Sequence, residues 1–136
     1  MPAGYSGTPL AKKLGFQDGE AVWVRGMPES VRAELDSQAR LRYLTRPPQA
    51  LANAHVFHTS AAKLEADLRN LRGKLAPAGQ VWVSWPKKAA KVETDITEDA
   101  IRKIALPMGY VDVKVCAVDE TWSGLKLVIR KELRGK

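Results

Sequence analysis

Residues 21–30 read AVWVRGMPES: an apolar run, a single glycine, and then a polar segment that starts at a proline. The run Ala21–Val24 is typical of a buried strand, and the pattern of residues 28–36 predicts a helix. In α/β proteins, a strand that turns through glycine into a helix is often where a phosphate or a cofactor is held. Such junctions usually carry several glycines and an acid further along the chain, whereas this one has only Gly26. The stretch therefore predicts the architecture of a nucleotide cleft without its usual chemistry.

Short apolar runs alternate with helical patterns along the rest of the chain. The expected strands are residues 21–24, 40–44, 54–58, 81–85, 111–115 and 125–129. Helices are expected after Thr8-Pro9, Pro28, Thr59-Ser60 and Thr97, and residues 40–44 could instead continue the second of these. The alternation predicts a Rossmann-like three-layer α/β sandwich, with a mostly parallel sheet of about five or six strands and a C-terminal antiparallel hairpin. No repeat or linker interrupts the pattern, so we expect residues 1–136 to form a single domain.

The clearest expected helix begins after Ser60 and runs as far as residues 77–79, where Pro-Ala-Gly follows. Its apolar residues share one stripe: Leu64, Leu68, Leu71 and Leu75. Charged residues, among them Asp67, are assigned to the faces away from this stripe. The pattern is that of a helix packed on the core along one side.

The other helices carry end signals. Thr8 is expected to cap the first helix and Gly15 to end it. Thr97 is expected to cap the last helix, with Ile96 and Ile101 packing together across its first turn as a hydrophobic staple. These signals make both boundaries testable.

Composition indicates an ordinary soluble globular protein, with 45% hydrophobic and 27% charged residues. No apolar run approaches the roughly 20 residues that cross a bilayer. The N-terminus lacks the pattern of a signal peptide. The single cysteine, Cys116, cannot form an internal disulfide, and no Cys/His spacing suggests a metal site. We therefore expect a cytoplasmic protein without a bound metal.

The chain is basic, with a net charge of +7 and a pI near 9.7. A basic surface suits nucleic acid, but Lys and Arg are scattered singly and in pairs such as Lys12-Lys13 and Lys87-Lys88. No long basic block and no RNA-binding aromatic motif is present. The pattern favours a solvated basic surface over a nucleic-acid interface and leaves both open.

Three segments together resemble the fold of S-adenosylmethionine-dependent methyltransferases. Residues 14–24 (LGFQDGEAVWV) are similar to the approach to strand one of that fold. Residues 71–83 (LRGKLAPAGQVWV) are similar to its passage of helix, Leu-x-Pro-x-Gly and strand five. The C-terminal hairpin resembles its strands six and seven. The resemblance implies a methyltransferase-like fold over most of the chain.

A narrower resemblance is to a small bacterial family of proteins of unknown function. It is carried by residues 4–15 (GYSGTPLAKKLG), 82–88 (WVSWPKK) and 113–126 (VKVCAVDETWSGLK). It extends along the whole chain and implies no mechanism.

Two departures from the methyltransferase pattern concern its cofactor. The resemblance implies a Gly-x-Gly run in the first loop, and Gly26 stands there alone. It implies an acid at the end of the second strand to hold the ribose hydroxyls, and Arg46 stands there instead. The chain is also short for such an enzyme and leaves little room for a third strand. From these departures we expect no cofactor, with S-adenosylmethionine disfavoured, and a protein that is not an enzyme.

Ligands of open α/β sheets bind beyond the carboxyl ends of the parallel strands. The residues expected there are Arg25, Gly26, Arg46, His58, Thr59, Ser60, Ser84, Trp85, Lys87 and Lys88. No acid appears among them, and a helix N-terminus at Ser60 adds free amides, so the set suits an anion. The alternative is that these are simply polar loop residues. His58 could act as an acid or base, but no carboxylate is evidently placed to orient it, which favours a structural role.

The remaining candidates also have two interpretations. Trp85 and Trp122 fall near strand ends, where a ring could stack on a base or cover the edge of the sheet. Cys116 is read as a small buried residue beside the strand face of Val113 and Val115. Asp119 and Glu120 could pair with the lysines at positions 87 and 88.

Two functional hypotheses follow. The first is a non-catalytic, methyltransferase-like module that binds an anionic small molecule, a nucleic acid or a protein partner. The second is a minimal S-adenosylmethionine-dependent methyltransferase. The single glycine and the missing acid favour the first hypothesis.

Overall fold

The computed structural model describes residues 7–134. Its strands are β1 (Ala21–Arg25), β2 (Arg42–Leu44), β3 (Leu51–Phe57), β4 (Leu75–Pro86), β5 (Tyr110–Ala117) and β6 (Trp122–Ile129). Its α-helices are α1 (Leu10–Leu14), α2 (Glu29–Asp36), α3 (Ala61–Arg72) and α4 (Glu98–Ala105). Short 3-10 turns are η1 (Lys88–Ala90), η2 (Leu106–Met108) and η3 (Lys131–Leu133). Residues 40–44 include a strand, as their alternation predicts.

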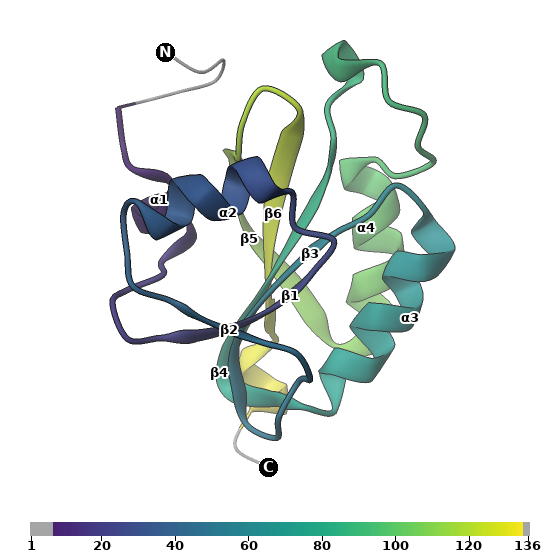
Figure 1. Ribbon diagram of the computed structural model, residues 1–136. Helices are drawn as coiled ribbons and strands as arrows, with labels where there is room; N and C mark the ends of the chain where they lie inside the picture. Colours follow the sequence, from purple (N-terminus) through teal and green to yellow (C-terminus); the bar gives the residue numbers. More distant parts are fainter. Residues whose placement is uncertain (1–6, 135–136) are drawn as a thin grey trace.

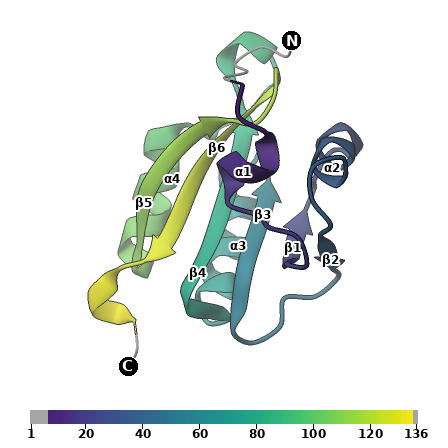
Figure 2. The ribbon, with the colours of Figure 1, turned by 90° about the vertical axis from the view of Figure 1, so that its left-hand side faces the viewer.

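The six strands form one sheet in the order β2-β1-β3-β4-β6-β5. β1 pairs in parallel with β2 and β3, and β3 pairs in parallel with β4. β6 is antiparallel to both β4 and β5 and forms the C-terminal hairpin with β5 (Figure 2). The predicted fold class is confirmed. Residues 45–50 lead from β2 to β3 without a helix or a further strand.

Helices cover both faces of the sheet (Figure 1). On one face, α1 and α2 pack Leu10, Leu14, Val31 and Leu35 against the sheet. On the other face, α3 and α4 pack the apolar residues Leu64, Leu68, Leu71 and Ile101. All of these side chains are at most 2% exposed, so both layers bury apolar area, the main source of stability in such a sandwich.

The end of α3 differs from the expectation. The helix stops at Arg72, and Leu75 is the first residue of β4, so residues 77–79 lie inside a strand. The Leu51 amide donates to the Lys74 carbonyl at 2.9 Å and draws the chain back to the sheet. Leu75 is still buried, because it enters the same core from the sheet side. Apolar periodicity alone could not separate these two routes into one core.

The predicted ends of the other helices are confirmed except at the start of α1. The Thr97 hydroxyl accepts from the Ala100 amide, and Ile96 and Ile101 are both buried as the staple requires. Gly15 ends α1 with a φ of 75°. The first residue before α1 is Pro9, which makes no side-chain cap, so the expected cap by Thr8 is wrong.

The hairpin differs from the expectation in both of its strands. β6 begins at Trp122, three residues before the expected strand 125–129. Val113 and Val115 are 54% and 49% exposed, so they do not form a buried face. The pairing with β6 shifts register between Asp112 and Lys114, and this irregularity in the edge strand breaks the simple alternation.

Within residues 7–134, no helix is long and apolar enough to span a membrane.

Candidate functional site

The carboxyl ends of β1, β3 and β4 meet at one edge of the sheet because these strands run parallel. We call this the carboxyl edge: residues 25–28 at the end of β1, 45–46 after β2, 58–60 after β3 and 87–96 after β4. In Figure 1 the turn after β4 stands at its top. The edge is where a sheet of this type binds its ligands.

A buried carboxylate lies at this edge, contrary to expectation. The Asp67 side chain of α3 contacts His58 Nε2 at 2.7 Å through Oδ2. It also accepts from Arg25, with Nε to Oδ2 and Nη2 to Oδ1 both at 3.2 Å. The side chains of His58 and Asp67 are 9% and 10% exposed, whereas that of Arg25 is 53% exposed. His58 therefore has an acidic partner that holds its ring.

The expectation that Asp67 faces away from the apolar stripe of the helix is wrong. Asp67 lies three residues after Leu64 and four before Leu71, which places it on the buried stripe of the helix. A charged residue on an apolar stripe needs a partner, because burying an unpaired charge is costly. That signal was in the sequence: Asp67 at this spacing predicts a basic partner on the sheet.

The N-terminus of α3 is covered by the protein's own acid instead of offering amides to an anion. Ser60 Oγ accepts from the Lys63 amide at 3.4 Å, and Asp95 Oδ1 accepts from the Ala61 amide at 2.7 Å. The Thr59 carbonyl accepts from the Thr94 hydroxyl at 2.7 Å and from the Asp95 amide at 3.3 Å. The expectation that this edge lacks acids is corrected: they come from the middle of α3 and from the segment before α4, not from the strand ends.

Two of the expected edge residues lie inside the protein. Ser84 is fully buried, and its hydroxyl is 2.8 Å from His55 Nε2 in the middle of the sheet. Trp85 is 8% exposed and packs in the core beneath α3 and α4, so its ring is not a surface for stacking. Burial also lowers the pKa of His55 to about 3, so this imidazole is neutral at pH 7.

The remaining basic residues are spread over the edge. Arg46 is exposed after β2, next to Thr45, whose carbonyl accepts from Trp23 Nε1 at 3.4 Å. Lys87 is held by its amide, which donates to the Thr121 carbonyl at 2.8 Å, and Lys88 is exposed. The structure thus groups Arg25 with His58, and Lys87 with Lys88, but it does not join all four into one cluster.

Asp119 does not pair with these lysines. Its Oδ1 accepts from the amides of Thr121 and Trp122, both at 2.8 Å, and so fixes the hairpin turn. Glu120 is exposed beside it. Asp119 therefore serves the fold, as side-chain caps of turns commonly do.

Two features of the structure require glycine at position 26: the positive φ of the turn and the close approach of strand β3. Its φ is +71°, and a Cβ added there would lie 2.8 Å from the Phe57 carbonyl oxygen. The turn from β1 into α2 can therefore pass β3 closely only with glycine at this position. After it, α2 starts at Glu29, and the residue before it, Pro28, provides no side-chain cap.

Trp122 and Cys116 are structural. The Trp122 ring meets Phe57 edge-to-face, with ring centroids 5.2 Å apart, and covers the sheet near the hairpin. Cys116 is half-buried, and burial raises the pKa of its thiol, which disfavours the reactive thiolate. In the described part of the chain, no group of three or more His, Cys, Asp or Glu side chains is placed to hold a metal ion.

No protein-family model matches this chain, and no curated protein sequence matches it. Solved structures do. A SAM-dependent methyltransferase from Aquifex aeolicus has a TM-score of 0.62 at 13% identity, over 89% of this chain and 88% of that one. A DhpI complex with SAH has a TM-score of 0.61 at 10% identity, over 89% and 82%. A pericyclic reaction enzyme has a TM-score of 0.53 at 10% identity, and this chain spans only 39% of its length.

These neighbours show that the fold is methyltransferase-like. They also correct two expectations. The expectation that the protein is not an enzyme is contradicted by neighbours that are methyltransferases, and the expectation of no cofactor by neighbours solved with SAM or SAH. No family match supports membership in the small bacterial family of unknown function.

Proposed function

We propose that this chain is a minimal S-adenosylmethionine-dependent methyltransferase whose site lies at the carboxyl edge. The observation that carries the proposal is the His58–Asp67 pair, with Nε2 and Oδ2 2.7 Å apart, at the end of β3 in a fold shared with methyltransferases of similar extent. A buried histidine oriented by a carboxylate is a common general base. It stands where α/β sheets place their ligands.

The first loop offers the cofactor backbone amides. The uncapped start of α2 presents free N–H groups after Gly26, whose missing side chain makes room for the Phe57 carbonyl of β3. The residues after β2 do not fit in the same way, because Arg46 stands where the resemblance implies an acid. We therefore expect binding that depends on the first loop and lacks the anchor to the ribose.

When bound, S-adenosylmethionine supplies an electrophilic methyl group. The chain's own contribution is to prepare the acceptor. Asp67 accepts the Nε2 proton of His58, which leaves Nδ1 as the nitrogen that can take a proton from an acceptor hydroxyl. Arg25 bonds both oxygens of the same carboxylate and so fixes its orientation toward the ring. Asp67 and Arg25 are thus positioning residues in this proposal.

Calorimetric titration with S-adenosylhomocysteine tests the proposal directly. Wild-type protein is expected to bind one equivalent, and adenine alone is expected to bind less tightly. Arg46→Asp supplies the missing acid and should tighten binding about tenfold through a charge-assisted hydrogen bond. Arg42→Asp is the matched control, since Arg42 is also exposed but lies at the start of β2, whereas Arg46 follows the end of that strand.

Absence of binding to both wild type and Arg46→Asp, with circular dichroism showing both folded, would overturn the proposal. Equal tightening by Arg42→Asp would also count against it, because the effect would then be one of overall charge.

A further inference from the structure

A hollow of about 450 Å³ lies between the end of β4 and the start of α4. We call it the β4–α4 hollow. Its apolar lining comes from Trp85, Pro86, Val92 and Ile96. Val92 is 43% exposed, whereas Trp85, Pro86 and Ile96 are buried, so Val92 stands at the mouth and the other three form the floor. A hollow of this size and apolar character matches small-molecule sites.

The basic groups of this hollow are Lys87 and Lys88. Lys87 is half-buried, and its amide donates to the Thr121 carbonyl, which holds its backbone beside the hollow. Among residues 7–134, the ion pairs formed do not involve either lysine. Both ammonium groups are therefore available to a ligand.

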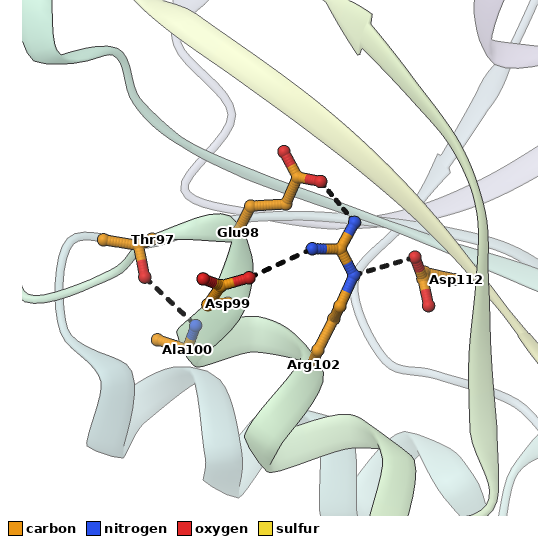
Figure 3. A network of polar contacts seen from close by, with 6 residues as sticks. All are labelled: Thr97, Glu98, Asp99, Ala100, Arg102 and Asp112. Carbon is orange, nitrogen blue, oxygen red and sulfur yellow. Dashed lines mark hydrogen bonds and ion pairs between the residues drawn. The ribbon is translucent and has the colours of Figure 1, made fainter.

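The acid that lines the hollow, Glu98, is already engaged. Its carboxylate bonds the Arg102 guanidinium, which also bonds Asp99 at 3.2 Å and Asp112 at 2.9 Å (Figure 3). The hydrogen bonds to Asp112 and Glu98 raise the pKa of Arg102, so its guanidinium stays protonated. Glu98 is thus bonded to Arg102, although one guanidinium shared by three carboxylates does not cancel their charge, and the cations that line the hollow are the two lysines.

The hollow is connected to the residue that follows His58. The segment of residues 92–96 forms one wall, and its Thr94 and Asp95 are bonded to the Thr59 carbonyl. Thr94 also lines a second, polar hollow with Thr59 and Ser60. The apolar hollow and the candidate base thus lie on neighbouring parts of the same edge.

We propose that the β4–α4 hollow binds the methyl acceptor, and that the acceptor is a small organic acid with an apolar body and a carboxylate or sulfonate group. This inference rests on the proposed function. The apolar floor of the hollow contacts the apolar part of the ligand, and the two lysines form ion pairs with its acidic group. A nucleic acid fits less well, because Trp85 is buried and cannot stack on a base, and two lysines make a short track for a polyanion.

A matched pair of probes tests the proposal by calorimetry: 1-naphthaleneacetate and its neutral amide, 1-naphthaleneacetamide. The acid is expected to bind about tenfold more tightly than the amide at low salt. Added salt should weaken binding of the acid and leave the amide nearly unchanged. Lys87→Ala/Lys88→Ala should remove the advantage of the acid, while Lys63→Ala/Lys103→Ala, an exposed pair on α3 and α4, should keep it.

Val92→Asp tests the apolar part, since this exposed position tolerates change without loss of the core. It should weaken binding of both probes. Failure of both probes to bind the wild type, or a preference for the acid that survives the Lys87/Lys88 double variant, would overturn the proposal. Because no cofactor is present in these titrations, their failure is distinct from failure to bind S-adenosylhomocysteine, which would overturn the proposed function and the role of the ligand as a methyl acceptor but not the binding of an organic acid in the hollow.

Discussion

The two faces of the sheet are built differently. Beneath α3 and α4 the buried side chains are almost all aliphatic or aromatic, and the polar pair of His58 and Asp67 sits only at the edge. Beneath α1 and α2 the sheet itself carries a buried polar row: Asn53, His55, Gln80 and Ser84. The face beneath α3 and α4 gains stability from the apolar surface area that it buries. The face beneath α1 and α2 must also provide hydrogen-bond partners for its buried polar groups.

The polar row explains how a five-residue helix can be held on the sheet. The Leu14 carbonyl at the end of α1 accepts from Gln80 Nε2 at 3.2 Å and from Trp82 Nε1 at 2.9 Å. Helices this short are not stable alone, and their last carbonyls need partners. Asn53 joins the row by accepting from Gln80 at 2.8 Å. The polar face therefore supports α1 through directed bonds, where the apolar face holds its helices by packing.

The largest effect should come from the apolar face. Leu68 is fully buried in α3, so Leu68→Ala removes apolar contact and leaves a cavity, at a cost of about 2–5 kcal/mol in the free energy of unfolding. Urea denaturation measures it. A decrease in the free energy of unfolding below about half a kcal/mol would lie outside the range typical of such substitutions. It would mean that the stability of the apolar face does not depend on the packing of Leu68.

The polar face should respond to pH. Burial lowers the pKa of His55 from 6.5 to about 3, so the unfolded chain binds this proton first as pH falls. Stability from the neutral histidine is fully present above pH 6.5 and is lost on acidification, by about 2 kcal/mol between pH 6.5 and pH 5.

The substitution His55→Gln isolates the pH-dependent contribution of His55 to the free energy of unfolding, because glutamine can still bond Ser84 but does not titrate. The difference in unfolding free energy between wild type and variant should shrink toward zero, or change sign, as pH is lowered. A difference that stays constant with pH would show that His55 is not buried as a neutral group.

The smallest effects should come from the ends of the helices on the apolar face. Thr97 Oγ1 is 3.0 Å from the Ala100 amide, and Thr97→Ala should cost about 1 kcal/mol. Ser60 Oγ is 3.4 Å from the Lys63 amide, and Asp95 already bonds the Ala61 amide, so Ser60→Ala should cost less, about 0.5 kcal/mol. Thermal unfolding of both variants shows which of the two substitutions destabilises the protein more. The reverse order would mean that Asp95 does not share the capping of α3.

The order of strands and helices could be predicted from the sequence because local signals agree with the fold: apolar runs of strand length, the staple at Ile96 and Ile101, and Gly15 after α1. The end of α3 could not, because Leu75 reaches the core equally well from a helix or from a strand. Periodicity reports burial and not the route of the backbone.

The site was harder to predict than the fold. Strand ends identified His58 and Arg25 correctly as edge residues, since parallel topology fixes where those ends meet. They could not identify Asp67 or Asp95, which come from a helix face and from a loop. Ser84 and Trp85 were placed at the edge although β4 continues to Pro86 and keeps both buried. Side chains that meet through tertiary packing leave only indirect traces in the sequence.

The Thr59 carbonyl ties residues 92–96 to the segment that follows β3. It accepts two of the hydrogen bonds that hold the wall of the β4–α4 hollow, from the Thr94 hydroxyl and from the Asp95 amide. Lifting residues 92–96 breaks these two bonds at once and removes Asp95 from the start of α3 in the same movement. Residues 92–96 are therefore held together with the start of α3, and the residue that accepts two of their hydrogen bonds is the immediate neighbour of His58.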